Sequence, residues 1–122
     1  MSSEIGKQTE AVLLHHLTAI GAGDVDDILT DYDEGSVLFT PDDPLRGPAQ
    51  IRPLFEKFVS DLLPPGSNFK MLQQEIAGEI AYIVCKADSV GYDFAIGTDT
   101  FVIRDGKISI QTFAVQITPK NT

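Results

Sequence analysis

The stretch GTDTFVIRDGK, residues 97–107, has the composition of a long β-strand that runs into a tight turn. Its β-branched and aromatic residues favour a strand, and Asp105-Gly106 is a common turn pair in β-hairpins. Asp99 lies in the middle of the strand, where aspartate is disfavoured and costly to bury without a partner. The stretch therefore predicts a hairpin, and Asp99 is either solvated or placed in a pocket.

Strand geometry places Asp99 on the more apolar face of this strand. Alternate side chains of a strand point to the same side, so Asp99 shares its face with Phe101 and Ile103. A carboxyl group there has a raised pKa, and in its protonated form it could donate a hydrogen bond to an oxyanion or act as a general acid. A carboxyl group that is merely hydrogen-bonded within the fold is the equally weighted alternative.

Three helices are predicted in the first half of the chain. The first covers residues 3–20 and ends before a glycine-rich turn. The second follows an N-cap at Asp24, and its apolar stripe ends at Tyr32. The third has its apolar stripe over residues 51–62, and its regular part should begin close to Pro53, because proline disrupts a helix interior.

The second half of the chain reads as consecutive strands. Helices followed by strands predict an α+β domain, with the helices packed on one face of an antiparallel sheet. A strongly curved sheet with helices across its concave face encloses a pocket. We expect one domain, 1–122. The predicted strands cover residues 36–40, 68–77, 80–88, 92–104 and 107–117.

Composition limits the classes of partner. The chain has 122 residues, 43 % of them hydrophobic, and a formal net charge of −9, which disfavours nucleic acid and anionic membranes as partners. The single cysteine, Cys85, excludes an internal disulfide and is expected to be a buried, inert thiol. No stretch has the length of a signal peptide's apolar run or of a membrane span, so we expect a cytoplasmic protein.

The two histidines of the first predicted helix point about 100° apart, so they cannot both face the core. His16 flanks the buried stripe and could exchange protons in a pocket, although a hydrogen-bonded histidine at the edge of the core is the commoner case. His15 lies on the far side. Their spacing does not suit a metal site, and the eight carboxylates between Asp24 and Asp43 are expected to form a solvated acidic face.

The position of Gln111 depends on the register of the last hairpin. A two-residue turn at Asp105-Gly106 places Thr112 opposite Asp99, whereas a three-residue loop places Gln111 there. A slip of one residue moves a side chain to the other face of the sheet. We favour the three-residue loop slightly, because it needs a positive φ only at glycine.

The order of elements, together with HHLTAIGAGDVDDILTDYDEGSVLF, PLRGPAQIRPLFEKF and TDTFVIRDGKI, resembles the SnoaL-like and ketosteroid-isomerase-like families. These families belong to the nuclear-transport-factor-2-like superfamily of cone-shaped α+β domains. The resemblance covers residues 7–117. It implies a cone-shaped barrel with a pocket, and a homodimer formed through the exposed sheet face.

The resemblance also implies roles for individual residues. In ketosteroid isomerases, a worked example of pKa tuning, a tyrosine on the first helix and a protonated aspartate form the oxyanion hole. Here His16 falls on the tyrosine position and Asp99 on the aspartate position. Thr40 stands where the family has its carboxylate base, and Gln111 where SnoaL-like cyclases have an acid/base residue.

Two functions follow from the sequence as hypotheses. The first is an isomerase, cyclase or lyase for a small hydrophobic molecule, in which Asp99 and His16 are catalytic and no metal or other cofactor takes part. The second is a non-catalytic ligand-binding or dimerisation module of the same fold. The other residues that we predict to contact the ligand are Leu13, Leu17, Tyr32, Phe55, Phe58, Tyr82, Phe101, Gln111 and Phe113.

Overall fold

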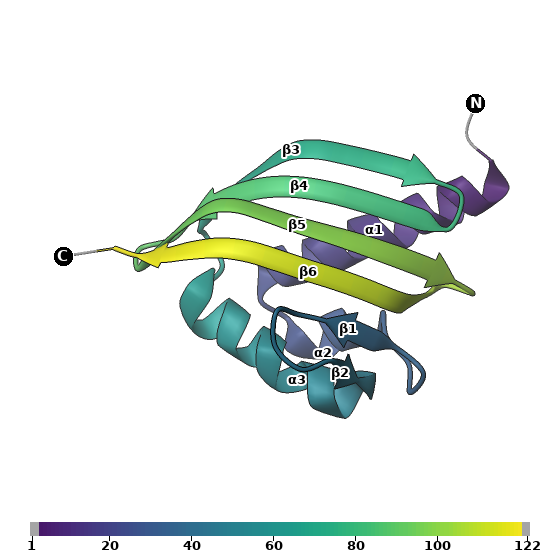
Figure 1. Cartoon of the computed structure of the whole chain (residues 1–122), viewed down its shortest axis with the longest axis horizontal. Coiled ribbons are helices and arrows are strands. Elements are labelled where there is room, and N and C mark those ends of the chain that lie inside the picture. The colour runs from purple at the N-terminus through teal and green to yellow at the C-terminus, as the bar shows by residue number, and fades with distance from the viewer. Residues whose placement is uncertain (1–2, 121–122) are drawn as a thin grey trace.

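A curved, open six-stranded sheet with helices on its concave side makes up the structure, a computed structural model that describes residues 3–120 (Figure 1). The strand order is β2-β1-β6-β5-β4-β3. The hydrophobic core lies between the helices and the concave face. The elements are α1 (Glu4–Ala22), α2 (Val25–Leu29), β1 (Val37–Phe39), β2 (Leu45–Arg46), α3 (Gly47–Lys57), the π-helix η1 (Phe58–Leu62), β3 (Asn68–Ala77), β4 (Ile80–Asp88), β5 (Tyr92–Arg104) and β6 (Lys107–Pro119).

The four long strands form an antiparallel meander, as the sequence predicts. The short strand β1 extends this sheet by pairing with β6, and the two run parallel, with Leu38 opposite Gln111. The prediction of an antiparallel sheet is therefore wrong for this one pair of strands. The sheet also stays open rather than closing into a barrel, since β2 and β3 form its two edges.

Helix α1 has well-formed ends. The Ser3 side chain accepts a hydrogen bond from the Gly6 amide at 2.8 Å, and Gly23 ends the helix in the left-handed conformation, with φ of 70°. The helix buries Leu13, His16 and Ala19 against the sheet. Within the described residues, no helix is long and apolar enough to cross a membrane.

Helix α2 is shorter than its apolar pattern suggests. Asp24 is its N-cap, as predicted, and accepts from the Asp27 amide at 3.1 Å. The helix ends at Leu29, so Tyr32 follows it in a turn and is not part of its stripe. This turn directs the Tyr32 side chain into the interior, where 4 % of the residue is exposed.

Helix α3 begins at Gly47, well before the predicted start near Pro53. Pro53 lies inside the helix, where it cannot donate one backbone hydrogen bond. Burial of Ile51 and Phe55 on the core side offsets that loss. The helix continues into the π-helix η1, which ends at Leu62, and its C-cap Leu63 directly precedes the predicted Pro-Pro-Gly terminator.

The last hairpin differs from both predicted registers. Asp105 and Gly106 both have positive φ and form a two-residue turn, so the three-residue loop is wrong. A bulge at Ser109 then shifts the pairing by one, which places Phe113 opposite Asp99 and Gln111 opposite Phe101. Gln111 consequently faces the concave side after all.

Candidate functional site

A cavity of about 200 Å³ lies between the concave face of the sheet and the helices α1 and α3. Four sets of paired residues line its sheet side, one from each successive level along the strands. The helices and the loop after η1 supply most of the opposite wall. The sheet residues are Phe69, Ala87 and Phe94 at one end; Cys85, Gly97 and Val115 next; Ile83, Asp99 and Phe113 further in; and Phe101, Gln111 and Leu38 at the far end.

The two ends of the cavity differ in exposure. We call the end at Gly21, Gly66 and Phe69 the mouth, because all three residues are exposed. The other end, here called the deep end, is formed by His16, Phe101 and Gln111 together with Leu38 and Asp99. The first three are 0–3 % exposed, so solvent reaches the cavity from the mouth.

Asp99 is the carboxyl group of this cavity, and no other Asp or Glu of residues 3–120 lines it. Burial raises the pKa of Asp99 to about 6, and the hydrogen bond that Gln111 Nε2 donates to its Oδ2, at 2.8 Å, opposes this rise. The group therefore changes its charge close to neutral pH. It can act as an acid or as a hydrogen-bond donor to a bound carbonyl group.

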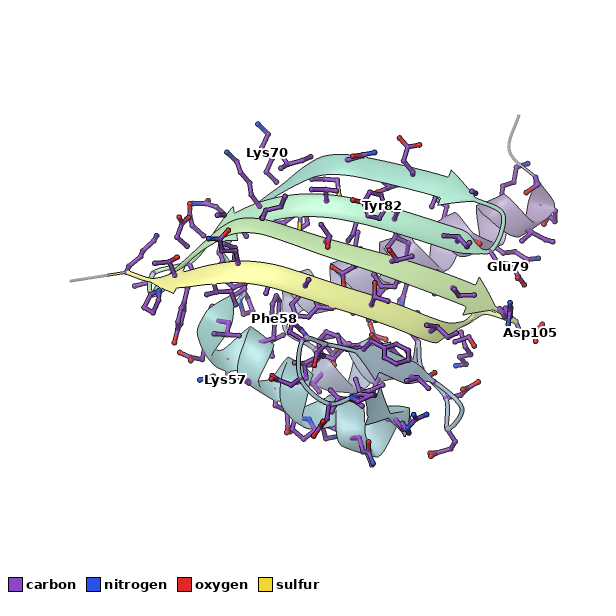
Figure 2. The ribbon with its side chains drawn as sticks, in the orientation of Figure 1. Lys57, Phe58, Lys70, Glu79, Tyr82 and Asp105 are labelled. Carbon is purple, nitrogen blue, oxygen red and sulfur yellow. The ribbon has the colours of Figure 1, made fainter. Side chains whose placement is uncertain are left out.

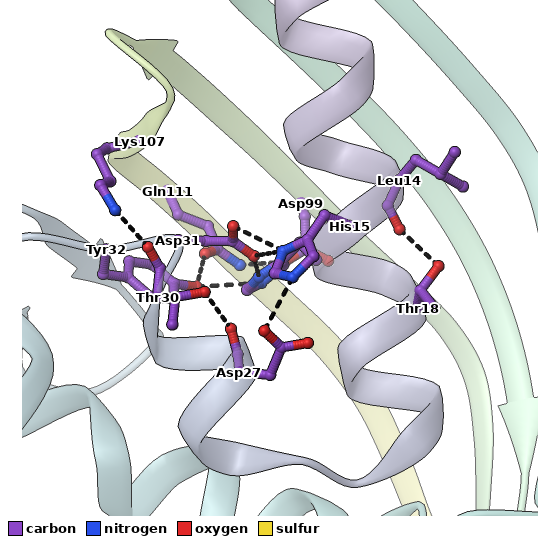
Figure 3. A network of polar contacts seen from close by, with 11 residues as sticks. Leu14, His15, Thr18, Asp27, Thr30, Asp31, Tyr32, Asp99, Lys107 and Gln111 are labelled. Carbon is purple, nitrogen blue, oxygen red and sulfur yellow. Dashed lines mark hydrogen bonds and ion pairs between the residues drawn. The ribbon is translucent and has the colours of Figure 1, made fainter.

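A chain of hydrogen bonds continues from Asp99 into the helical layer (Figure 3). Gln111 Oε1 accepts from the Tyr32 hydroxyl, and the Tyr32 oxygen lies 3.2 Å from His16 Nε2. His16 Nδ1 lies 3.0 Å from Asp31 Oδ2. The rings of Tyr32, Phe55 and Phe101 each pack against the His16 ring in an edge-on arrangement. These contacts hold the imidazole in place.

Asp31 also binds the second histidine. Its carboxylate oxygens lie 2.8 and 2.9 Å from His15 Nδ1, while His15 Nε2 lies 3.0 Å from Asp27 Oδ1 (Figure 3). These contacts, the one to Asp31 first, raise the pKa of His15. The side chain of His15 is 41 % exposed and that of Asp31 8 %. Asp31 therefore joins the buried chain to the surface of the protein.

The middle of the cavity is apolar. Burial, followed by the charge of Asp99, raises the pKa of Cys85 to about 11, so its thiol is neutral there. This agrees with the inert thiol expected from sequence, although Cys85 is only partly buried and lines the cavity. A Cβ atom at Gly97 would lie 3.4 Å from both Cys85 Sγ and Val115 Cγ2, so a side chain there would narrow the cavity.

The structure brings together most of the residues predicted for the site. Eight of them line the cavity: Asp99, His16, Leu17, Phe55, Phe58, Phe101, Gln111 and Phe113.

Three predicted residues lie elsewhere. Leu13 packs in the core, and Tyr32 lies behind the cavity wall, where it reaches the site through its hydroxyl. Tyr82 is on the wrong face, because it pairs with Thr100 on the convex side of the sheet (Figure 2). The alternation of side chains along β4 could have excluded Tyr82 from the cavity, since its neighbours Ala81 and Ile83 are the buried residues.

Two positions deserve separate mention. Asp31 belongs to the acidic run that the sequence predicts to be solvated, and this prediction is wrong for Asp31, which is buried between two histidines. Nothing in the sequence distinguishes it from the carboxylates around it. Thr40, which the sequence resemblance places at the position of a carboxylate base, does not line the cavity, and its hydroxyl accepts from the Asp42 amide at 3.0 Å.

The curved, open sheet with helices on its concave side is the nuclear-transport-factor-2-like α+β fold. The model of the SnoaL-like domain matches residues 13–110, and the chain belongs to that family. No curated protein matches the sequence. The family assignment therefore rests on the family model.

Three solved structures share the fold. An NTF2-like protein of unknown function from Mesorhizobium loti has a TM-score of 0.78 and 18 % identity, over 95 % of this chain and 97 % of that one. A protein designated a ketosteroid isomerase, from Kribbella flavida, gives 0.74 and 13 %, over 95 % and 83 %. An LEH-like epoxide hydrolase from M. tuberculosis gives 0.71 and 13 %, over 90 % and 84 %. At these identities, the similarity is evidence for the fold alone.

Proposed function

We propose that the protein binds a small, mostly apolar molecule in the cavity and catalyses a cofactor-independent acid/base reaction on it, an isomerisation or an elimination. The observation that carries this proposal is Asp99: one carboxyl group on a mostly apolar cavity wall, beside His16 and Gln111, with a pKa raised to about 6. Asp99 is the acid or the donor to a developing oxyanion. Catalytic carboxyl groups with raised pKa values occupy such environments in other enzymes.

The size of the cavity limits the ligand. A cavity of about 150 Å³ holds one benzene molecule, and pockets for drug-sized ligands start at about 300 Å³. The volume here, about 200 Å³, falls between them. A molecule with one or two rings and one carbonyl or hydroxyl group fits this space, with its polar end at Asp99 and its apolar body along Phe113 and Val115.

A deuterium-exchange experiment tests the catalytic proposal. Cyclic ketones and enones with one ring are incubated with the protein in D₂O, and NMR follows deuterium incorporation next to the carbonyl group. We expect incorporation above the buffer rate for at least one compound, and Asp99→Asn should lose most of it, since a general acid or base contributes about 10²–10⁴-fold. Wild-type protein that binds such a compound and leaves its protons unexchanged contradicts catalysis.

A cavity-filling variant serves as the control for the location of binding. Gly97→Val places two methyl groups between Cys85 and Val115, in the middle of the cavity, and valine suits a strand. Ligand-induced chemical shift changes at Phe113 should disappear in this variant. If they persist, the ligand lies outside the cavity.

A non-catalytic binding module of the same fold is the second candidate function. It is favoured by the location of Thr40 outside the cavity and by the lack of a second carboxylate among the described lining residues. The experiments above separate the two candidates, because a binding module gives ligand shifts that Gly97→Val removes and gives no deuterium exchange.

We further propose that two copies of the chain pair through the convex face of the sheet. Ile80, Val102, Ile110 and Val37 are paired residue by residue across four strands and form an apolar row there. Ile80 is 45 % exposed and Ile110 38 %. A second copy would cover such a row. Light scattering should give a dimer mass for the wild type and a monomer mass for Ile110→Lys; a monomeric wild type contradicts the proposal.

A further inference from the structure

The buried chain of hydrogen bonds has the imidazole of His16 at one end and the carboxyl group of Asp99 at the other. His16, Tyr32 and Gln111 are 0 %, 4 % and 3 % exposed, so water does not complete their hydrogen bonds. Among the described residues, no buried side-chain nitrogen or oxygen lacks a partner. Each link of the chain therefore needs one donor and one acceptor, and the whole chain has a direction.

The amide of Gln111 sets this direction. In the structure its Oε1 accepts from the Tyr32 hydroxyl and its Nε2 donates to Asp99 (Figure 3). The Tyr32 oxygen has then used its single proton, so it accepts from His16 Nε2. His16 Nδ1 donates to the Asp31 carboxylate. Protons on both ring nitrogens make His16 an imidazolium, and the donor at Oδ2 suits an ionised Asp99.

Rotation of the amide by 180° reverses the chain. Gln111 Nε2 then donates to the Tyr32 oxygen, and the Tyr32 hydroxyl turns to donate to a neutral His16 at Nε2. Gln111 Oε1 faces Asp99 and needs a donor there, which a protonated Asp99 supplies. Both directions contain the same number of protons and carry the same net charge.

We propose that His16 and Asp99 share one proton through Tyr32 and Gln111, so that ionised Asp99 occurs with an imidazolium at His16 and protonated Asp99 with a neutral His16. The inference deepens the proposed acid/base function and rests on it for its relevance to catalysis. Gln111 does not transfer a proton in this arrangement. It is a positioning residue, whose orientation decides whether Asp99 faces a donor or an acceptor.

The surroundings of the pair support this coupling. Asp31 and, beyond it, His15 and Asp27 are the charged groups at the His16 end. Tyr32 and Cys85 face Asp99, and burial holds their pKa values well above neutral, so both are uncharged. The pKa of Asp99, raised to about 6, allows both of its forms close to neutral pH. No Lys or Arg of residues 3–120 lines the cavity.

NMR titration of the ligand-free protein tests the proposal. The ¹³Cγ shift of Asp99 and the ¹⁵N shifts of the His16 ring are followed against pH. A shared proton gives each residue two titration steps at the same two midpoints, separated by about one pH unit or more, because the midpoints belong to the pair. One step for each residue, at its own midpoint, overturns the proposal.

Two variants interrupt the chain and one matched variant leaves it intact. Gln111→Met keeps the length of the side chain and removes both hydrogen bonds, and Tyr32→Phe removes only the hydroxyl. In either variant each residue should show a single step. Gln116→Met, at an exposed position of the same strand, should keep the two shared midpoints. Two shared midpoints that persist in both interrupted variants also overturn the proposal.

The test is independent of the proposed function. Shared midpoints together with no deuterium exchange would leave the coupling standing and remove the catalytic proposal. Deuterium exchange together with separate midpoints would do the reverse.

Discussion

The deep end and the mouth of the cavity differ in the polarity and in the exposure of their side chains. At the deep end, the polar residues His16 and Gln111 are buried and hydrogen-bonded, and Asp99 is partly buried and hydrogen-bonded. At the mouth, the large apolar side chain of Phe69 is 50 % exposed. A buried polar group stabilises the fold only with its partners in place, whereas an exposed apolar group has few contacts to lose. Substitutions should therefore act strongly at the deep end and weakly at the mouth.

Phe101→Ala should have the largest effect. Phe101 is 1 % exposed and packs against His16, so truncation leaves a cavity at the deep end and lowers the free energy of unfolding by about 3–5 kcal/mol. Urea denaturation at pH 7 measures this loss. Phe69→Ala is the matched truncation at the mouth and should lower it by under about 1 kcal/mol. Similar losses for the two variants would contradict the contrast between the ends.

Asp99→Asn should change how stability depends on pH. The pKa of Asp99 is raised from 3.8 to about 6, so the folded protein holds this proton more tightly than the unfolded chain does. The stabilisation is complete below about pH 4 and is lost as the pH rises through 6. Relative to the wild type, Asp99→Asn should therefore gain up to about 3 kcal/mol between pH 4 and pH 7.5.

The pH series is measured by urea denaturation of both proteins. The comparison of wild type with variant cancels the other carboxyl groups, which titrate in both. A constant difference between the two proteins across this range would mean that Asp99 ionises at its ordinary pKa, and the electrostatic contrast between the deep end and the mouth would be wrong.

The sequence predicts most of this fold, because its signals are local. Alternation along residues 92–104 places Asp99 and Phe101 on the buried face, and caps or glycines mark the ends of α1. The start of α3 was mispredicted, because the burial of Ile51 and Phe55 is a tertiary effect that outweighs the cost of Pro53. The parallel pairing of β1 with β6 joins segments about 70 residues apart, and no local pattern indicates it.

The residues of the candidate site also divide into those that local sequence signals predict and those that they do not. Asp99 and His16 could be chosen from strand parity and helix spacing, since each lies on a regular element. Gln111 faces the cavity through a two-residue turn combined with a bulge, a pairing that the turn sequence does not indicate. Asp31 lies in a turn, where no periodicity assigns a direction, so its place between the two histidines could come only from the structure.

Asp31→Asn should have an intermediate effect on stability. In the wild type, the residue Asp31 is 6 % exposed, and its carboxylate accepts hydrogen bonds from both His15 and His16. An amide has one oxygen instead of two, so a buried hydrogen bond to a charged group is lost, at a cost of about 2 kcal/mol. Urea denaturation measures it. Asp26→Asn is the matched control, because Asp26 pairs with Arg52 on the surface and is 85 % exposed; its effect should be under about 1 kcal/mol.

His15→Asn should have the smallest effect on the free energy of unfolding, and this effect should depend on pH. Contacts with Asp31 and Asp27 raise the pKa of His15 above 6.5, so its stabilisation is present below pH 6.5 and is lost as the pH rises through the folded value. The side chain is 41 % exposed, and solvent screening limits the contribution to under about 1 kcal/mol. Urea denaturation at pH 5.5 and pH 8.5 should show a larger loss for the variant at the lower pH. An equal loss at both values would mean that the outer end of the chain, unlike the deep end, carries no proton-linked stability.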